Sequence, residues 1–152
     1  MQLSSKGLAL LKASEGFRSR VYLDVDGLPT IGYGHRLLHP ESFPNGVCEA
    51  EAAQILISDI RESEQVVRGM VKVPLTQGQF DALVDFVFNL GSGRLHNSTL
   101  LADLNARRYE AAAEQILLWD HADANENAAL QARRNAEFQL FSPGMEIHKA
   151  VA

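Results

Sequence analysis

Apolar residues recur every three or four positions along most of this chain, but residues 18 to 34 follow a different pattern. There the helical period is lost, with Val21, Tyr22, Val25, Ile31 and Tyr33 around an Asp26-Gly27 turn signal, and Pro29 limits strand pairing to an edge. A helical period places side chains on one face of a helix, whereas alternation suits a strand. The sequence therefore predicts a mostly helical α+β protein with one small, strongly twisted β-hairpin near its N-terminus.

Helices are expected on both sides of this hairpin. The first covers about residues 3 to 14 and places Glu15 at the end of its apolar face, where Gly16 supplies a stop signal. The best-marked helix begins at Thr76, which has the capping-box spacing to Gln79. We predict further helices over about residues 49–68, 100–104, 109–119 and 128–141, and a polar loop over 120–127.

Composition narrows the class of protein. No stretch approaches the roughly 20 apolar residues of a membrane span, and the first residues lack the apolar run of a secretory signal, so we expect no membrane insertion. The net charge is −5, and residues 41–64 account for all of it, with six acids against one base. No basic stripe is present, so we expect no nucleic-acid partner. The single Cys48 excludes an internal disulfide.

The sequence lacks the signatures of metal and cofactor enzymes. Its five histidines are scattered, with no HExxH pair and no cysteine partner, so no zinc site is expected. It also lacks a P-loop, a dinucleotide-binding fingerprint and a GxSxG elbow. We therefore predict chemistry by acidic side chains, without a metal or a cofactor.

Glu15, Asp24 and Thr30 are the candidates for that chemistry. Glu15 ends an apolar helix face, so partial desolvation should favour its protonated form and suit it to donate a proton. Asp24 precedes an exposed turn, where water and backbone donors can keep it ionised. Hydrolysis of a glycosidic bond requires two such carboxyls, one as acid and one as base or charge stabiliser. On spacing alone a structural interpretation is equally open: a helix-terminal acid paired with an arginine, a turn acid and a strand residue.

Asp24 and Thr30 can act together only if the hairpin places them on one face. We predict a hairpin centred on Gly27, with an odd number of loop residues, which sets Asp24 opposite Thr30. Thr30 could then help Asp24 to hold and deprotonate a water, because a hydroxyl both accepts and donates hydrogen bonds. A two-residue turn at Asp26-Gly27 would point the two side chains to opposite faces, and this mechanism would fail.

Several motifs follow one another in a known order. The first three are Glu15–Arg18, Tyr22–Asp24 and Thr30–His35, the last of which reads TIGYGH. Further along stand Asn45–Val47, Val67–Gly69, Phe86–Gly91, Asn97–Leu100, Tyr109–Ala112 and Arg133-Arg134 with Glu137. Over roughly residues 5 to 141, this series resembles glycoside hydrolase family 24, the phage-type lysozymes.

The resemblance implies a bilobed, lysozyme-like fold that binds a glycan between its lobes. The small lobe would cover about residues 16–58, the linking helix about 49–68, and the helical lobe about 70–142 together with the first helix. The implied reaction is hydrolysis of the β-1,4 bond between N-acetylmuramic acid and N-acetylglucosamine in bacterial peptidoglycan, with inversion. In the family, the residue matching Glu15 donates the proton, and those matching Asp24 and Thr30 manage the water. Inversion calls for carboxyls roughly 6.5 to 9.5 Å apart.

The resemblance also assigns roles outside the catalytic signature. It implies a structural ion pair between His35 and Asp59 that supports the fold. One arginine of the pair at 133 and 134 is expected to face the catalytic glutamate. Substrate contacts are implied for Phe88, which could equally be a core residue, and for Asn89, Ser98, Gln115 and Arg134.

The resemblance further predicts a monomeric endolysin that lyses its host. It would be made in the host cytoplasm without a signal peptide and reach the wall through a phage-made pore, an expectation that comes from the family alone. Two alternatives remain: a lytic transglycosylase, which would have little use for Asp24 and Thr30, and an inactive wall-binding module, against which the intact triad argues. Many relatives are basic, whereas this chain is acidic, so its long-range attraction to the anionic wall should be weaker.

Overall fold

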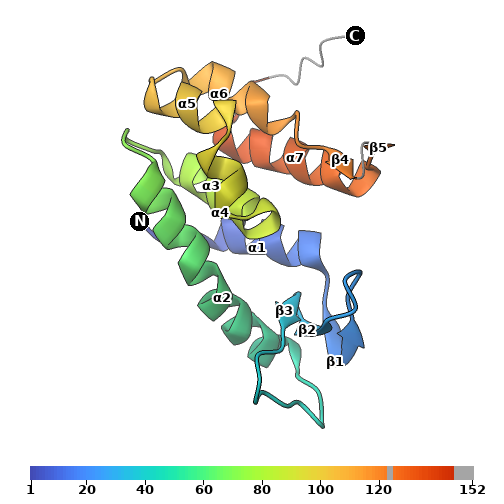
Figure 1. Cartoon of the computed structure of the whole chain (residues 1–152). Helices are drawn as coiled ribbons and strands as arrows, with labels where there is room; N and C mark the ends of the chain where they lie inside the picture. Colours follow the sequence, from blue (N-terminus) through green and yellow to red (C-terminus); the bar gives the residue numbers. More distant parts are fainter. Residues whose placement is uncertain (123–124, 146–152) are drawn as a thin grey trace. The chain divides into compact units, whose positions relative to one another are not determined.

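The computed structural model describes residues 1–122 and 125–145 (Figure 1). It divides into a hairpin unit, Leu11–Glu62, and a helical unit formed by Met1–Leu10 and the chain from Ser63 onward. Most of the described residues lie in helices, as Figure 1 shows, which confirms the predicted mostly helical α+β class. None of the described helices combines the length and the apolar character needed to cross a membrane.

The first two helices lie where the sequence predicts them. Helix α1 runs from Ser5 to Glu15 and ends at Gly16, whose φ of +69° favours glycine and whose N–H donates to the Lys12 carbonyl at 3.0 Å. Helix α2 runs from Glu49 to Met70. Its predicted end near residue 68 is therefore two residues short.

Helix α3, Gln77–Leu90, begins with the predicted capping box. The Thr76 hydroxyl accepts the Gln79 N–H at 3.2 Å, and the Gln79 side chain accepts the Thr76 N–H at 2.9 Å. Each interaction satisfies a backbone donor that the first turn of a helix leaves without a partner.

The rest of the helical unit contains four more helices and two very short strands among its described residues. Helix α7 is capped by Asn127, whose Oδ1 accepts the backbone N–H groups of Ala129 and Leu130 at 3.0 Å each. The predicted polar loop over 120–127 is partly wrong, because two strands pair there. The elements are α4 Ser92–His96, which was not predicted, α5 Thr99–Asn105, α6 Tyr109–Ile116, β4 His121–Ala122, β5 Asn125–Glu126 and α7 Ala128–Phe141.

The core of the helical unit is built mainly from aromatic and aliphatic side chains of helices α3 to α7. Burying one large apolar side chain contributes roughly 1.5 to 3 kcal/mol. This unit therefore carries most of the apolar stabilisation of the described chain. Its largest fully buried apolar residues are Phe80, Phe86, Phe138, Phe141, Leu83, Leu95, Leu100 and Leu104.

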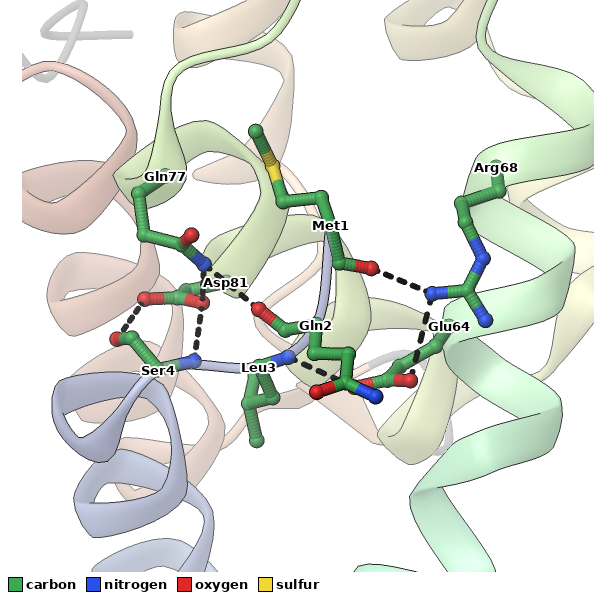
Figure 2. A network of polar contacts seen from close by, with 8 residues as sticks. All are labelled: Met1, Gln2, Leu3, Ser4, Glu64, Arg68, Gln77 and Asp81. Atoms are coloured by element: carbon green, nitrogen blue, oxygen red, sulfur yellow. Dashed lines mark hydrogen bonds and ion pairs between the residues drawn. The ribbon is translucent and has the colours of Figure 1, made fainter.

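Residues 1–4 of the helical unit are held by hydrogen bonds to two buried carboxylates, and Figure 2 shows these contacts. The Leu3 N–H donates to Glu64 at 2.7 Å, and Ser4 donates both its N–H and its hydroxyl to Asp81. Glu64 is 7% exposed and Asp81 is 1% exposed. The start of α1 is therefore held by side chains of α2 and α3.

The hairpin unit contains one antiparallel sheet of strands β1 Arg18–Leu23, β2 Pro29–Gly32 and β3 His35–Arg36, in that order. Strand β3 was not predicted. Strand β2 packs closely on α2, because a Cβ on Gly32 would lie 3.0 Å from that of Ala52. The sheet thus lies directly against α2 within this unit.

The loop between β1 and β2 has an odd number of residues, 24 to 28, as predicted. The predicted centre at Gly27 is wrong, because Tyr22 pairs with Thr30 and the centre is Asp26. The Asp24 N–H donates to the Leu28 carbonyl at 3.0 Å, which closes the loop one residue earlier than expected. Asp24 therefore faces Leu28 instead of Thr30. Because Asp24 lies two positions after Tyr22, the partner of Thr30, we expect its side chain on the same face of the hairpin as that of Thr30.

Candidate active site

Glu15 is the last residue of α1 and is half-buried. Two contacts dock Tyr33 on this end of the helix: the Phe17 ring lies 5.5 Å from the Tyr33 ring, and the Lys12 ammonium lies 5.4 Å above it. The next residue, Gly34, has a φ of +80°, and a Cβ there would lie 3.1 Å from Glu15 Oε2. The Glu15 carboxyl therefore lies against the backbone of the turn between β2 and β3. This turn needs glycine at position 34 because of its positive φ and because a side chain there would crowd Glu15.

Asp24 is held as a carboxylate by three donors. Its Oδ1 accepts the N–H groups of Asp26 and Leu28, each at 2.9 Å, and its Oδ2 accepts Arg36 Nε at 2.9 Å. The Leu28 N–H has the largest effect and, with the other two donors, lowers the pKa of Asp24 despite some desolvation. The prediction that backbone donors at the turn keep Asp24 ionised agrees with this geometry.

Arg36 was missed by the sequence analysis. It lies on β3, opposite Thr30, and its Nη2 also donates to Asp26 Oδ2 at 2.6 Å. A third strand two residues long has no pattern of its own, so nothing in the sequence pointed Arg36 toward Asp24. Its contact is visible only once the register of β2 and β3 is known.

Thr30 is 2% exposed, and its hydroxyl donates to the Leu28 carbonyl at 3.0 Å. Leu28 is also the residue that exchanges hydrogen bonds with Asp24. Asp24 and Thr30 thus both hydrogen-bond to Leu28, although they do not pair directly with each other as predicted. With its proton directed to Leu28, the Thr30 oxygen retains lone pairs that can accept a hydrogen bond.

The predicted pair of His35 and Asp59 is present, with 2.9 Å between Nδ1 and Oδ2. A second acid, Glu41, was not predicted and lies 3.0 Å from His35 Nε2. Burial of the ring opposes its charged form, but the hydrogen bonds to Asp59 and Glu41 outweigh this and raise the pKa of His35. The contacts join β3, the following loop and α2, which is consistent with structural support.

In the helical unit, two predicted substrate-binding residues contact each other. Arg134 is fully buried, and its Nη2 donates to Asn89 at 2.8 Å and to Glu137 at 2.7 Å. The neighbouring Arg133 makes two bonds to buried Asp85, at 2.8 and 3.0 Å, a partner that the sequence analysis missed.

The other predicted residues of the helical unit differ in surroundings. Ser98 caps α5: its hydroxyl accepts the Leu101 N–H at 3.1 Å and donates to the Leu95 carbonyl at 2.7 Å. Phe88 and Gln115 are half-buried on α3 and α6. Within the described residues, no group of three histidine, cysteine or acidic side chains is arranged to hold a metal ion.

Comparisons with known proteins agree on one family. A family model described as phage lysozyme matches residues 12–137. The endolysin of Salmonella phage P22 is 38% identical over 137 residues, which cover 88% of this chain and 94% of that protein. A crystal structure of a P22 lysozyme mutant superposes with a TM-score of 0.84 at 36% identity, over 93% of this chain and 98% of that one. The muramidase domain of SpmX from Asticaccaulis excentricus has a TM-score of 0.85 at 35% identity, over 92% and 97%.

Proposed function

The chain belongs to the phage lysozyme family, and from this premise we propose that it hydrolyses peptidoglycan through Glu15, Asp24 and Thr30. The enzyme is a glycoside hydrolase of the lysozyme type. The bond that we propose is the β-1,4 link from N-acetylmuramic acid to N-acetylglucosamine. Cleavage proceeds with inversion at the anomeric carbon.

The observation that carries the proposal is the triple hydrogen bonding of the Asp24 carboxylate. A base must be ionised before it can take a proton, and three donors favour the ionised form of Asp24. In the proposed step, Asp24 accepts one proton of the attacking water while the water oxygen bonds to the anomeric carbon. The Thr30 oxygen accepts a hydrogen bond from the second proton and orients the water.

Glu15 supplies the complementary half of the reaction. In its acid form it donates a proton to the glycosidic oxygen, which leaves as the hydroxyl of the second sugar. Half-burial against Gly34 limits the water around this carboxyl. A lytic transglycosylase would instead close an anhydro ring and leave Asp24 and Thr30 without a task.

The products distinguish these reactions. Digestion of peptidoglycan in ¹⁸O-labelled water should place one label at each new reducing end, and NMR should detect the α-anomer first because inversion converts a β bond. Anhydro-muramic ends without label would identify a transglycosylase, and intact glycan would identify a wall-binding module.

Glu15→Gln tests the acid directly. The variant should fold normally and lose about 10²- to 10⁴-fold in kcat, because an amide cannot donate the proton. Glu62→Gln, on an exposed side chain of α2, is the matched control and should keep full activity. Turnover by Glu15→Gln at the wild-type rate would assign the acid to another residue.

We also propose that Phe88, Asn89, Ser98 and Gln115 contact the glycan, and that the predicted Arg134, which is fully buried, acts indirectly by holding Asn89. Gln115→Ala should then raise KM with little change in Tm. Ser98→Ala should cost about 1 kcal/mol of stability as well, because the same hydroxyl caps α5. Unchanged KM in Gln115→Ala would remove that residue from the binding set.

The proposed biological setting extends the family resemblance. We propose a monomer made in the host cytoplasm that reaches the peptidoglycan through a phage-made pore. Purified enzyme should lyse cells whose membrane has been permeabilised and spare intact cells. Size-exclusion chromatography with light scattering tests the monomer.

A further inference from the structure

The Asp24 carboxylate has little free hydrogen-bonding capacity. A carboxylate offers about four lone-pair positions, two on each oxygen. Both positions of Oδ1 are taken by the N–H groups of Asp26 and Leu28, and one position of Oδ2 is taken by Arg36 Nε. The remaining position is on Oδ2, the oxygen that Arg36 contacts.

Arg36 is itself fixed on two sides. Its backbone pairs with Thr30, and its Nη2 donates to Asp26 Oδ2 at 2.6 Å. The planar guanidinium therefore joins two carboxylates of one loop through two donors held at a fixed angle. The Arg36 side chain is 53% exposed and that of Asp24 is 15% exposed, so removing the arginine leaves no large cavity.

We propose that Arg36 is a positioning residue for Asp24, which it holds so that the one open lone pair of Oδ2 receives the attacking water. This inference rests on the proposed role of Asp24 as base. Rotation of the carboxylate would direct an occupied oxygen at the water, and Arg36 opposes that rotation at Oδ2 while the loop N–H groups oppose it at Oδ1. Asp26 acts one step further out, as the anchor of Arg36.

The charge of Arg36 adds a second effect. After the Leu28 and Asp26 N–H groups, its positive charge and hydrogen bond contribute to the lowered pKa of Asp24. The Arg36 guanidinium faces Asp24 and Asp26, the two charged side chains of the loop over residues 24–28. Because a base works above its own pKa, loss of Arg36 should move the acidic limb of the kcat profile to higher pH.

Four variants test the proposal on the full chain with peptidoglycan as substrate. Arg36→Met keeps length but removes charge and donors, and we expect kcat to fall about 10- to 100-fold with an unchanged Tm and a raised acidic limb. Arg36→Lys should restore much of the limb but little of the rate, since one ammonium cannot bridge two carboxylates as a guanidinium does. Asp26→Asn keeps the charge of Arg36 but removes its anchor, so kcat should fall more weakly than in Arg36→Met and the acidic limb should not rise. Arg61→Met, exposed on α2, should match the wild type.

The outcomes distinguish the proposed role of Arg36 from the proposed role of Asp24 as base. If Arg36→Met keeps kcat within about twofold, or loses rate without a shift of the acidic limb, Arg36 is not a positioning residue. Should Arg36→Met fail to fold, Asp26→Asn decides by its kcat alone: a rate within about twofold of the wild type overturns the proposal. An active Asp24→Asn variant would instead show that Asp24 is not the base, whatever Arg36 does.

Discussion

One ion pair of the hairpin unit borders water, whereas one ion pair of the helical unit is withdrawn from it. Arg36 and Asp24 have side chains 53% and 15% exposed, and their contacts lie within one loop and the adjacent strand. In the helical unit, Asp85 and its partner Arg133 are 0% and 7% exposed and join α3 to α7. The same kind of ion pair therefore lies in two very different environments.

The difference matters because water competes with a partner only where it has access. A buried charge that loses its partner keeps the full cost of desolvation, about 3 to 5 kcal/mol, whereas an exposed charge regains water. The buried cluster also changes its own ionisation: burial raises the pKa of Glu137 well above its ordinary value. Substitutions in the hairpin loop should thus alter activity, and substitutions in the buried cluster should alter stability.

Asp24→Asn should show the largest effect. The amide cannot take a proton from water, so kcat should fall about 10²- to 10⁴-fold, while Tm changes little because the side chain borders solvent. Steady-state kinetics on peptidoglycan and thermal unfolding provide the two readouts. A large loss of Tm would mean that Asp24 stabilises the fold as the buried charges do, and would contradict the difference between the two units.

Asp85→Asn makes the same chemical change in the helical unit. It removes the charge of the carboxylate that accepts two hydrogen bonds from Arg133, while Glu137 lies 3.9 Å from Arg133 Nε, and we expect a loss of about 3 to 5 kcal/mol in the free energy of unfolding. The folded fraction should retain its kcat. Urea unfolding measures the loss, and Glu114→Gln, on an exposed side chain of α6, is the control. A loss below about 1 kcal/mol would mean that solvent reaches this cluster.

Prediction from sequence succeeded where local chemistry decides the outcome. The capping box at Thr76 and the stop at Gly16 depend on residues three or four positions apart, and both are present. The assignment of Asp24 as an ionised turn acid also depends on nearby N–H groups, and the structure agrees with it.

Prediction failed where the outcome depends on register or on distant partners. The hairpin centre shifted from Gly27 to Asp26 because the Asp24 side chain closes the loop with its own hydrogen bonds, which the Asp26-Gly27 signal does not reveal. Asp85 lies 48 positions from Arg133, and only the packing of α3 on α7 joins them. The contact of Arg36 with Asp24 depends on strand β3, which is only two residues long and too short to show a period in the sequence.

His35 lies between these two extremes, and its effect should be the smallest. Its ring is 11% exposed, but its partners Asp59 and Glu41 are 28% and 38% exposed, so solvent screens the pairs. His35→Asn should cost about 1 kcal/mol. The size of this loss should depend on pH, which separates it from a simple packing defect.

The direction follows from the shifted groups. The folded pKa of His35 is raised above 6.5, so its stabilisation is complete below that pH and is lost as pH rises through the folded value. The folded pKa of Glu41 is lowered below 4.5, chiefly by the Leu38 N–H, so its contribution is present above that pH and is lost in stronger acid. Burial raises the pKa of Asp59 above 3.8, so its charged form opposes folding once pH has risen through the folded value.

The difference in unfolding free energy between wild type and His35→Asn should therefore be greatest between about pH 4.5 and 6.5 and shrink toward pH 9. Urea unfolding at pH 5.5 and pH 9 measures it, with His96→Asn, an exposed histidine of the helical unit, as the control. A difference that stays constant with pH would mean that His35 stabilises the hairpin unit by packing alone. The two acids would then hold a neutral ring, and exposure would no longer predict how charges act in this unit.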